Sequence, residues 1–179
     1  MKRIDIEATL NESRTWLLTT FEGLSDEQLR RPLTKSEHDP ANSWSALDHF
    51  AHLALVERDF EQMIRRQLAG HPNLVGLLTD ERGEVRTREE IMEIVNARTE
   101  EFQRDHNGDS LSEVVALTSG ARGKTLRLLA ELSDAQLDEQ LVGAPWGDGT
   151  IGAVIGANAR HAHVHWDWVT DAGLFESTG

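Results

Sequence analysis

The stretch from residue 43 to residue 69 constrains the fold of this chain most strongly. It contains no glycine or proline and is rich in Ala, Leu, Glu, Arg and Gln, which all favour helix. Gly70 and Pro72 follow it and end the pattern. The sequence therefore predicts that residues 43–69 form the longest helix of the protein.

Four other segments show helical patterns of apolar residues, and no segment shows the strict alternation of a half-buried strand. We therefore expect an all-α fold. The four segments run from about Ile4 to Glu22, from a cap at Thr87 to near Asn107, from a cap at Ser110 or Ser112 to Leu132, and from Thr150 to near Asp171.

A short motif occurs twice, each time after a predicted helix. Residues 24–29 read Leu-Ser-Asp-Glu-Gln-Leu, and residues 132–137 read Leu-Ser-Asp-Ala-Gln-Leu. Both copies have the Ser-x-x-Gln spacing of a capping box, which predicts a short helical turn. The repeat is either a common way to punctuate helices or a sign that two related helical pairs form the bundle.

Length and composition narrow the class of protein. A chain of 179 residues has the length of one domain, so we expect residues 1–179 to form a single domain. The net charge of −13 argues against a nucleic-acid partner. The sequence has no cysteine, so any metal must be held by His, Asp or Glu. No stretch approaches the ~18 apolar residues of a membrane span and no secretion signal is present, so we expect a cytoplasmic protein without membrane contact.

The last predicted helix carries three of the eight histidines, at positions 161, 163 and 165. His161 and His165 are four residues apart, so they lie one above the other on the same side of a helix, in the middle of its apolar stripe. Histidines at this spacing often bind one metal ion. His163 lies on the opposite side, where we expect an outer-face residue or a contact to a neighbour. The alternative for the pair is structural, with one ring bonded to Asn158 or to a carboxylate of the helix at 43–69.

That long helix contains two candidates for a third ligand, His49 and His52. The helix is apolar nearly all round, so periodicity does not decide between them. Asp48 lies one turn before His52 and is a candidate to orient that ring, although an acidic residue in a first helical turn is also favoured by the helix dipole. Asn158, one turn before His161, is a second candidate for a functional role.

The residues around these histidines resemble a known family. Trp44-Ser45 followed by His52, and then His161 and His165, are similar to the two histidine motifs of the DinB-like (YfiT/DinB) superfamily of metal-binding helical bundles. The resemblance spans nearly the whole chain in helix order. It departs after the last histidine, where relatives often have Arg-Gly-Gln and this chain has Trp-Asp-Trp at 166–168. That difference concerns contacts to a substrate more than metal binding.

The resemblance implies an antiparallel four-helix bundle with one long crossover connection and short extra helices. It also implies a divalent metal ion, Zn, Ni, Fe or Mn, held by His52, His161 and His165. Part of the family transfers or isomerises with a low-molecular-weight thiol, and another part hydrolyses small molecules. We therefore expect a metal-dependent transferase or hydrolase acting on a small molecule, with no general acid or base assigned. The alternative functions are a non-catalytic stress-response bundle and a helical dimerisation module without metal.

Large aromatic residues support two further expectations. Four tryptophans, at positions 44, 146, 166 and 168, are candidates for the wall of a substrate pocket, although large aromatic residues most often belong to a core. Trp16, Phe60 and Phe102 lie at positions that one core stripe does not explain. Together with the family resemblance, this leads us to expect a homodimer.

Overall fold

Seven helices and a two-stranded sheet make up the computed structural model, which describes residues 2–36, 38–141 and 148–176. In chain order these elements are α1 (Arg3–Glu22), α2 (Asp26–Arg30), β1 (Pro32–Lys35), β2 (Ser43–Ser45), α3 (Ala46–Leu68), α4 (Arg88–His106), α5 (Leu111–Glu131), α6 (Asp134–Leu137) and α7 (Ile151–Asp171).

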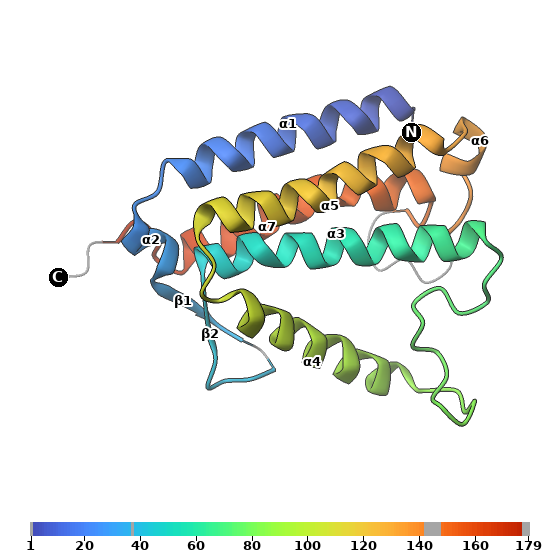
Figure 1. Ribbon diagram of the computed structural model, residues 1–179, viewed down its shortest axis with the longest axis horizontal. Helices are drawn as coiled ribbons and strands as arrows, with labels where there is room; N and C mark the ends of the chain where they lie inside the picture. The colour runs from blue at the N-terminus through green and yellow to red at the C-terminus, as the bar shows by residue number, and fades with distance from the viewer. Residues whose placement is uncertain (1, 37, 142–147, 177–179) are drawn as a thin grey trace.

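Helices α1, α3, α5 and α7 form a bundle in which α3 packs on α5 and α7, and α1 packs on the other sides of the same two helices. Helix α4 lies outside this bundle and packs on α3 (Figure 1). It carries the chain back along the bundle, so α3 and α5 run in the same direction, while α1 and α7 run in the opposite one (Figure 1). The predicted all-α class and the long crossover connection are confirmed. The crossover is the segment between α3 and α5.

Most helices begin at side chains that the sequence identifies. Ser25 and Ser133, the serines of the repeated motif, each form a capping box with the glutamine three residues later. Thr87 caps α4 and Thr150 caps α7, as predicted. Of the two candidates at the start of α5, Ser110 is the cap. These side-chain oxygens accept hydrogen bonds from backbone N–H groups that the first helical turn leaves unpaired.

The expectation that the chain lacks strands is wrong for a short hairpin. Strands β1 and β2 pair antiparallel, with Thr34 opposite Trp44, and the long helix consequently begins at Ala46 rather than at residue 43. The two strands have four and three residues, which is too short for an alternating pattern to show. The hairpin lies at the end of the bundle where α3 begins (Figure 1).

The apolar core consists of two clusters of buried side chains. One contains Ile6, Leu10, Phe60 and Ile155, and the other contains Leu17, Phe21, Phe50 and Val169. In the first cluster α7 approaches its neighbours closely at Gly152, where a Cβ atom would lie 3.1 Å from the carbonyl oxygen of Leu137. A side chain at this position would require the neighbouring chain to move by a few tenths of an ångström.

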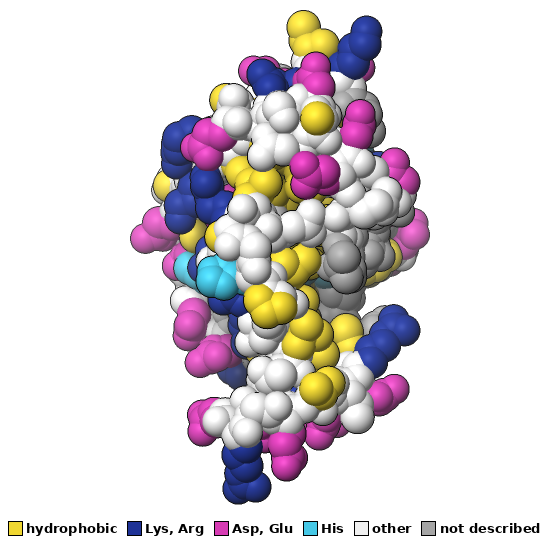
Figure 2. Space-filling view, turned by 90° about the vertical axis from the view of Figure 1, so that its right-hand side faces the viewer, with side chains coloured by type: hydrophobic (Ala, Val, Ile, Leu, Met, Phe, Trp, Pro, Cys, Tyr) yellow, Lys and Arg dark blue, Asp and Glu magenta, His cyan; other side chains and the backbone are white. Residues whose placement is uncertain are grey.

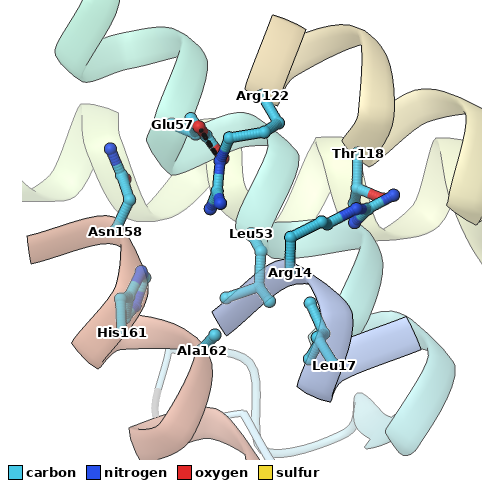
Figure 3. A pocket seen from close by; sticks show the side chains of 9 residues that line it. All are labelled: Arg14, Leu17, Leu53, Glu57, Thr118, Arg122, Asn158, His161 and Ala162. Atoms are coloured by element: carbon cyan, nitrogen blue, oxygen red, sulfur yellow. Dashed lines mark hydrogen bonds and ion pairs between the residues drawn. The ribbon is translucent and has the colours of Figure 1, made fainter. Parts of the chain in front are cut away.

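Polar and charged side chains from the four bundle helices surround a small internal cavity (Figure 3). The cavity has a volume of about 10 Å³, which is room for one water molecule. Arg122 Nε donates to Glu57 Oε1 at 2.6 Å, and both residues are buried. Arg14 donates to the hydroxyl oxygen of Thr118 at 2.8 Å. Burial and the neighbouring Arg122 lower the pKa of Arg14 to about 10. His161 also lines this cavity.

The surface is mixed rather than uniformly polar. Figure 2 shows the end of the bundle where α1 begins and α3 ends, and hydrophobic side chains gather in the middle of this face with charged ones around them. Ile4 is 71% exposed and Leu68 is 39% exposed in these two helix ends. None of the described helices combines the length and the apolar character needed to span a membrane.

Two isoleucines in the first turns of α1 provide a matched test of this packing. Ile6 is fully buried, whereas Ile4 is 71% exposed. We expect Ile6→Ala to lower the free energy of unfolding by about 2–5 kcal/mol, because it leaves a cavity in the core. Ile4→Ala should change it by less than about 0.5 kcal/mol. Urea unfolding of both variants measures the difference, and equal losses would contradict the described orientation of α1.

The unfolding curve of the unmodified protein tests the prediction that residues 1–179 form a single domain. A single domain should unfold in one transition.

Candidate metal centre

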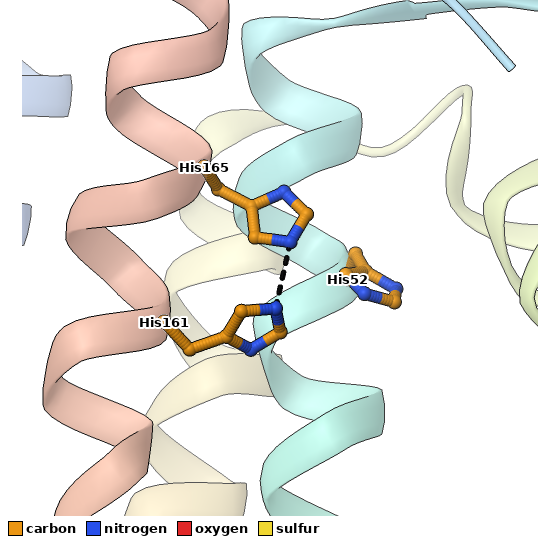
Figure 4. Close-up of side chains that lie close together, drawn as sticks. All are labelled: His52, His161 and His165. Carbon is orange, nitrogen blue, oxygen red and sulfur yellow. Dashed lines mark hydrogen bonds between the residues drawn. The ribbon is translucent and has the colours of Figure 1, made fainter. Parts of the chain in front are cut away.

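Helices α3 and α7 bring three histidines together in the bundle. His52, His161 and His165 each offer a ring nitrogen, and these nitrogens all lie within 4.8 Å of one another (Figure 4). The capping box of Ser45 and Asp48 begins α3 one turn before its first histidine. On α7, His161 and His165 are separated by one helical turn, so both rings project toward α3 (Figure 4).

Hydrogen bonds connect the histidine rings. The Nε2 atoms of His161 and His165 lie 2.8 Å apart, and the Nδ1 atoms of His165 and His49 lie 2.7 Å apart. The other ring nitrogen of His49, Nε2, lies 2.7 Å from the hydroxyl oxygen of Thr34 on β1. A continuous chain of side-chain hydrogen bonds therefore runs from the hairpin to α7.

Burial keeps these imidazoles uncharged at neutral pH. It lowers the pKa of His52 to about 3 and the pKa values of His49 and His161 to about 4. Burial also lowers the pKa of His165, and the neighbouring imidazoles lower it further. A neutral imidazole has a free lone pair on one nitrogen, which is the form that binds a metal.

One nitrogen in this cluster is buried without a hydrogen-bond partner among the described residues, the Nδ1 atom of His52. Leaving such an atom unpaired costs about 1–3 kcal/mol. A divalent ion bound by the three imidazoles would give this nitrogen's ring a partner. Zn, Ni, Fe and Mn all accept a set of three imidazole ligands.

The other two histidines of these helices do not belong to the set of three converging nitrogens. His49 is buried beside His165, but it is outside the set of three converging nitrogens. His163 is exposed and stacks on Trp16 of α1, with the ring centroids 3.8 Å apart. The prediction that His163 lies away from the pair is confirmed, and the residue is both exposed and in contact with a neighbouring side chain.

The proposed role of Asp48 as the partner of His52 is wrong. Its carboxylate accepts hydrogen bonds from the backbone N–H and hydroxyl of Ser45 and from the side chain of Gln103. Asp48 is therefore a helix cap, and it is 5% exposed rather than on the surface. Asn158 is buried beside His161 in the lining of the small cavity, and its amide donates to the carbonyl oxygen of Ile155.

Two of the four tryptophans contact the histidines. Trp44 is buried with its ring against His49 and His52, and its Nε1 has no hydrogen-bond partner among the residues that the structure describes. Trp168 packs on His165 at 4.7 Å between ring centroids but is 52% exposed.

A third tryptophan, Trp166, does not contact His49, His52, His161 or His165 in the described structure. Trp166 packs on Trp16 and Phe21, in the partly buried margin of the second core cluster. Position 146 lies outside the described residues.

Sequence reasoning missed two parts of this region. Thr34, the partner of His49, lies on a strand too short to predict, and its sequence neighbours carry no signal of a site. The polar group around Arg14, Glu57 and Arg122 comes from three different helices, each with one such residue inside an apolar stripe. Charged residues at core positions of α1, α3 and α5 are a signal that could have indicated it.

The lowered pKa values predict that stability falls in acid. Between pH 6.5 and about pH 4 the unfolded chain binds protons at these histidines and the folded chain does not. The free energy of unfolding must therefore decrease as pH falls through this range. His165→Phe removes one such group and should flatten the dependence, whereas His71→Gln, at an exposed position, should not. Melting temperatures of metal-free protein at pH 7.5 and pH 5 test this, and equal slopes in all three proteins would contradict it.

Comparison with known proteins assigns the chain to a family. A family model described as the DinB superfamily matches residues 9–169. This range includes all three converging histidines, the whole of α3 and α5, and most of α1 and α7. No curated protein and no solved structure matches the chain. Because the family model covers most of its length, the chain belongs to the DinB superfamily.

Proposed function

We propose that this protein is a divalent-metal-dependent enzyme that acts on a small molecule. In this proposal His52, His161 and His165 hold the ion. The enzyme is either a transferase that uses a low-molecular-weight thiol or a hydrolase. The observation that carries the proposal is the convergence of three uncharged imidazoles from two helices within 4.8 Å.

The number of ligands favours catalysis over a structural role for the ion. Three protein ligands leave at least one coordination position for water or substrate, whereas structural sites are usually closed by four. His52 and His161 each keep part of their surface exposed, and Trp168, which packs on His165, is 52% exposed, so the cluster is not fully enclosed. When bound, a divalent ion supplies Lewis acidity that activates water or a thiol near neutral pH.

The residues around the histidines indicate what the chain itself contributes. The sequence contains no cysteine, so a reacting thiol must come from a cosubstrate. The indole N–H of Trp44, buried beside His52, is a donor available to a bound ligand. The net charge of −13 favours compact ligands over polyanions such as nucleic acid.

Metal binding is the first test. Protein purified without an affinity tag and loaded with Zn²⁺ should retain about one ion, measured by elemental analysis after gel filtration. His52→Ala, His161→Ala and His165→Ala should each abolish stoichiometric retention, because two imidazoles alone bind an ion weakly. His163→Ala is the matched control and should retain the ion. Full retention by the His161→Ala/His165→Ala double variant would contradict the ligand assignment.

Turnover is the second test, and it separates the two reactions. Metal-loaded protein is incubated with a panel of small electrophiles and esters, with and without glutathione, bacillithiol or mycothiol. A transferase should consume an electrophile only when a thiol is added, whereas a hydrolase needs none. Either activity should disappear in His165→Ala. Stoichiometric metal binding without turnover of any compound would favour the non-catalytic stress-response alternative.

We also propose that the protein is a homodimer, although the three aromatic residues that first suggested it do not support it. Phe60 and Phe102 are buried within one chain, and Trp16 stacks on His163. The support comes from the exposed apolar side chains at the end of the bundle shown in Figure 2. Sedimentation at micromolar concentration should show a dimer, and a monomer alone would contradict the proposal.

A further inference from the structure

His49 connects the candidate metal centre to the hairpin. It lies on α3 one turn before His52 and is 5% exposed. Both of its ring nitrogens have partners: Nδ1 lies 2.7 Å from Nδ1 of His165, and Nε2 lies 2.7 Å from the hydroxyl oxygen of Thr34. His49 is thus fully engaged on the side of His165 that faces away from His161.

The positions of the protons along this chain follow from the proposed metal ligand. A neutral imidazole carries one proton and one lone pair. The Nε2 of His165 points to the Nε2 of His161, so this is the atom that would bind the ion. The proton of His165 must then lie on Nδ1, where it donates to His49. Because the Nδ1 of His49 accepts that bond, its own proton lies on Nε2 and is donated to Thr34.

We infer that His49 is a positioning residue for the metal centre. It holds the ring of His165 with Nε2 toward the ion, and Thr34 in turn holds the ring of His49. This inference rests on the proposed function, since it assumes that His165 binds a metal. Ligating histidines generally donate their second ring N–H to an acceptor that fixes the orientation and the tautomer of the ring. Here that acceptor is a second imidazole.

The inference also gives the hairpin a role in the site. Thr34 on β1 pairs with Trp44 on β2, and the ring of Trp44 packs against both His49 and His52. The hairpin thus provides the hydrogen-bond acceptor for His49 and an aromatic surface beside it. The hairpin lies beside the first turns of α3 (Figure 1), which is where its side chains contact the histidines.

Two substitutions at His49 separate its hydrogen bond from its volume. His49→Phe keeps a ring of similar size but has no acceptor for the N–H of His165. His49→Asn is smaller, but its amide oxygen is an acceptor near the position of Nδ1. We expect His49→Phe to weaken Zn²⁺ binding about 10- to 100-fold, as for other partners of ligating histidines. His49→Asn should retain most of the affinity.

Affinity is measured by competition with a chelating dye, and His71→Phe at an exposed position is the control for introducing phenylalanine. A lower affinity of His49→Asn than of His49→Phe would show that packing dominates and would overturn the inference. Should His49→Phe fail to fold, Thr34→Val provides the second variant. It removes the acceptor for His49 and should also weaken Zn²⁺ binding, and an unchanged affinity would overturn the inference.

The tautomers provide a readout that a purely structural role would not change. In ¹⁵N-labelled protein loaded with ¹¹³Cd²⁺, long-range ¹H–¹⁵N spectra should show His165 protonated at Nδ1 and His49 protonated at Nε2. Coupling to cadmium should appear at Nε2 of His165 and at neither nitrogen of His49. Coupling to His49 would make it a ligand and overturn the positioning role while leaving metal binding intact. Failure of the unmodified protein to bind any metal would overturn the proposed function as well.

Discussion

Burying four imidazoles between α3 and α7 is the constraint on which the rest of this site depends. An imidazole removed from water must be neutral, and each of its nitrogens needs a partner. Hydrogen bonds that run from Thr34 through His49 and His165 to His161 provide most of these partners. The Nδ1 of His52 stays outside that network among the described residues. The same burial that lowers the pKa values of these rings keeps their lone pairs available for a metal.

The fold provides the geometry for this arrangement. Helices α3 and α7 pack side by side and run in opposite directions (Figure 1), so His49 meets His165 while His52 lies beside His161 and His165. The crossover through α4 is what allows α5, rather than α4, to complete the bundle next to α3. The buried ion pair of Glu57 and Arg122 lies around the same small cavity as His161. Breaking such a pair would leave an uncompensated charge beside the histidines.

Sequence reasoning predicted the helices well because their signals are local. Caps such as Thr87 and Thr150, and the repeated Ser-x-x-Gln, act within one helical turn, so the sequence alone determines them. The pairing of His161 with His165 follows from helical geometry in the same way. The role of Asp48 could not be predicted. Its carboxylate could either complete the capping box with Ser45 or orient the ring of His52, and side-chain directions in three dimensions decide between the two. The link from Thr34 to His49 depends on a tertiary contact between a hairpin and a helix.

The central claim is that three imidazoles and no carboxylate hold the ion, with a position left open. X-ray absorption spectroscopy at the zinc edge tests it most directly, using untagged protein loaded with one equivalent of Zn²⁺. The account predicts three nitrogen ligands at about 2.0–2.1 Å with the multiple scattering of imidazole, and at least one further light ligand from solvent. A first shell of oxygen atoms without imidazole scattering, or a closed shell of four imidazoles, would contradict it.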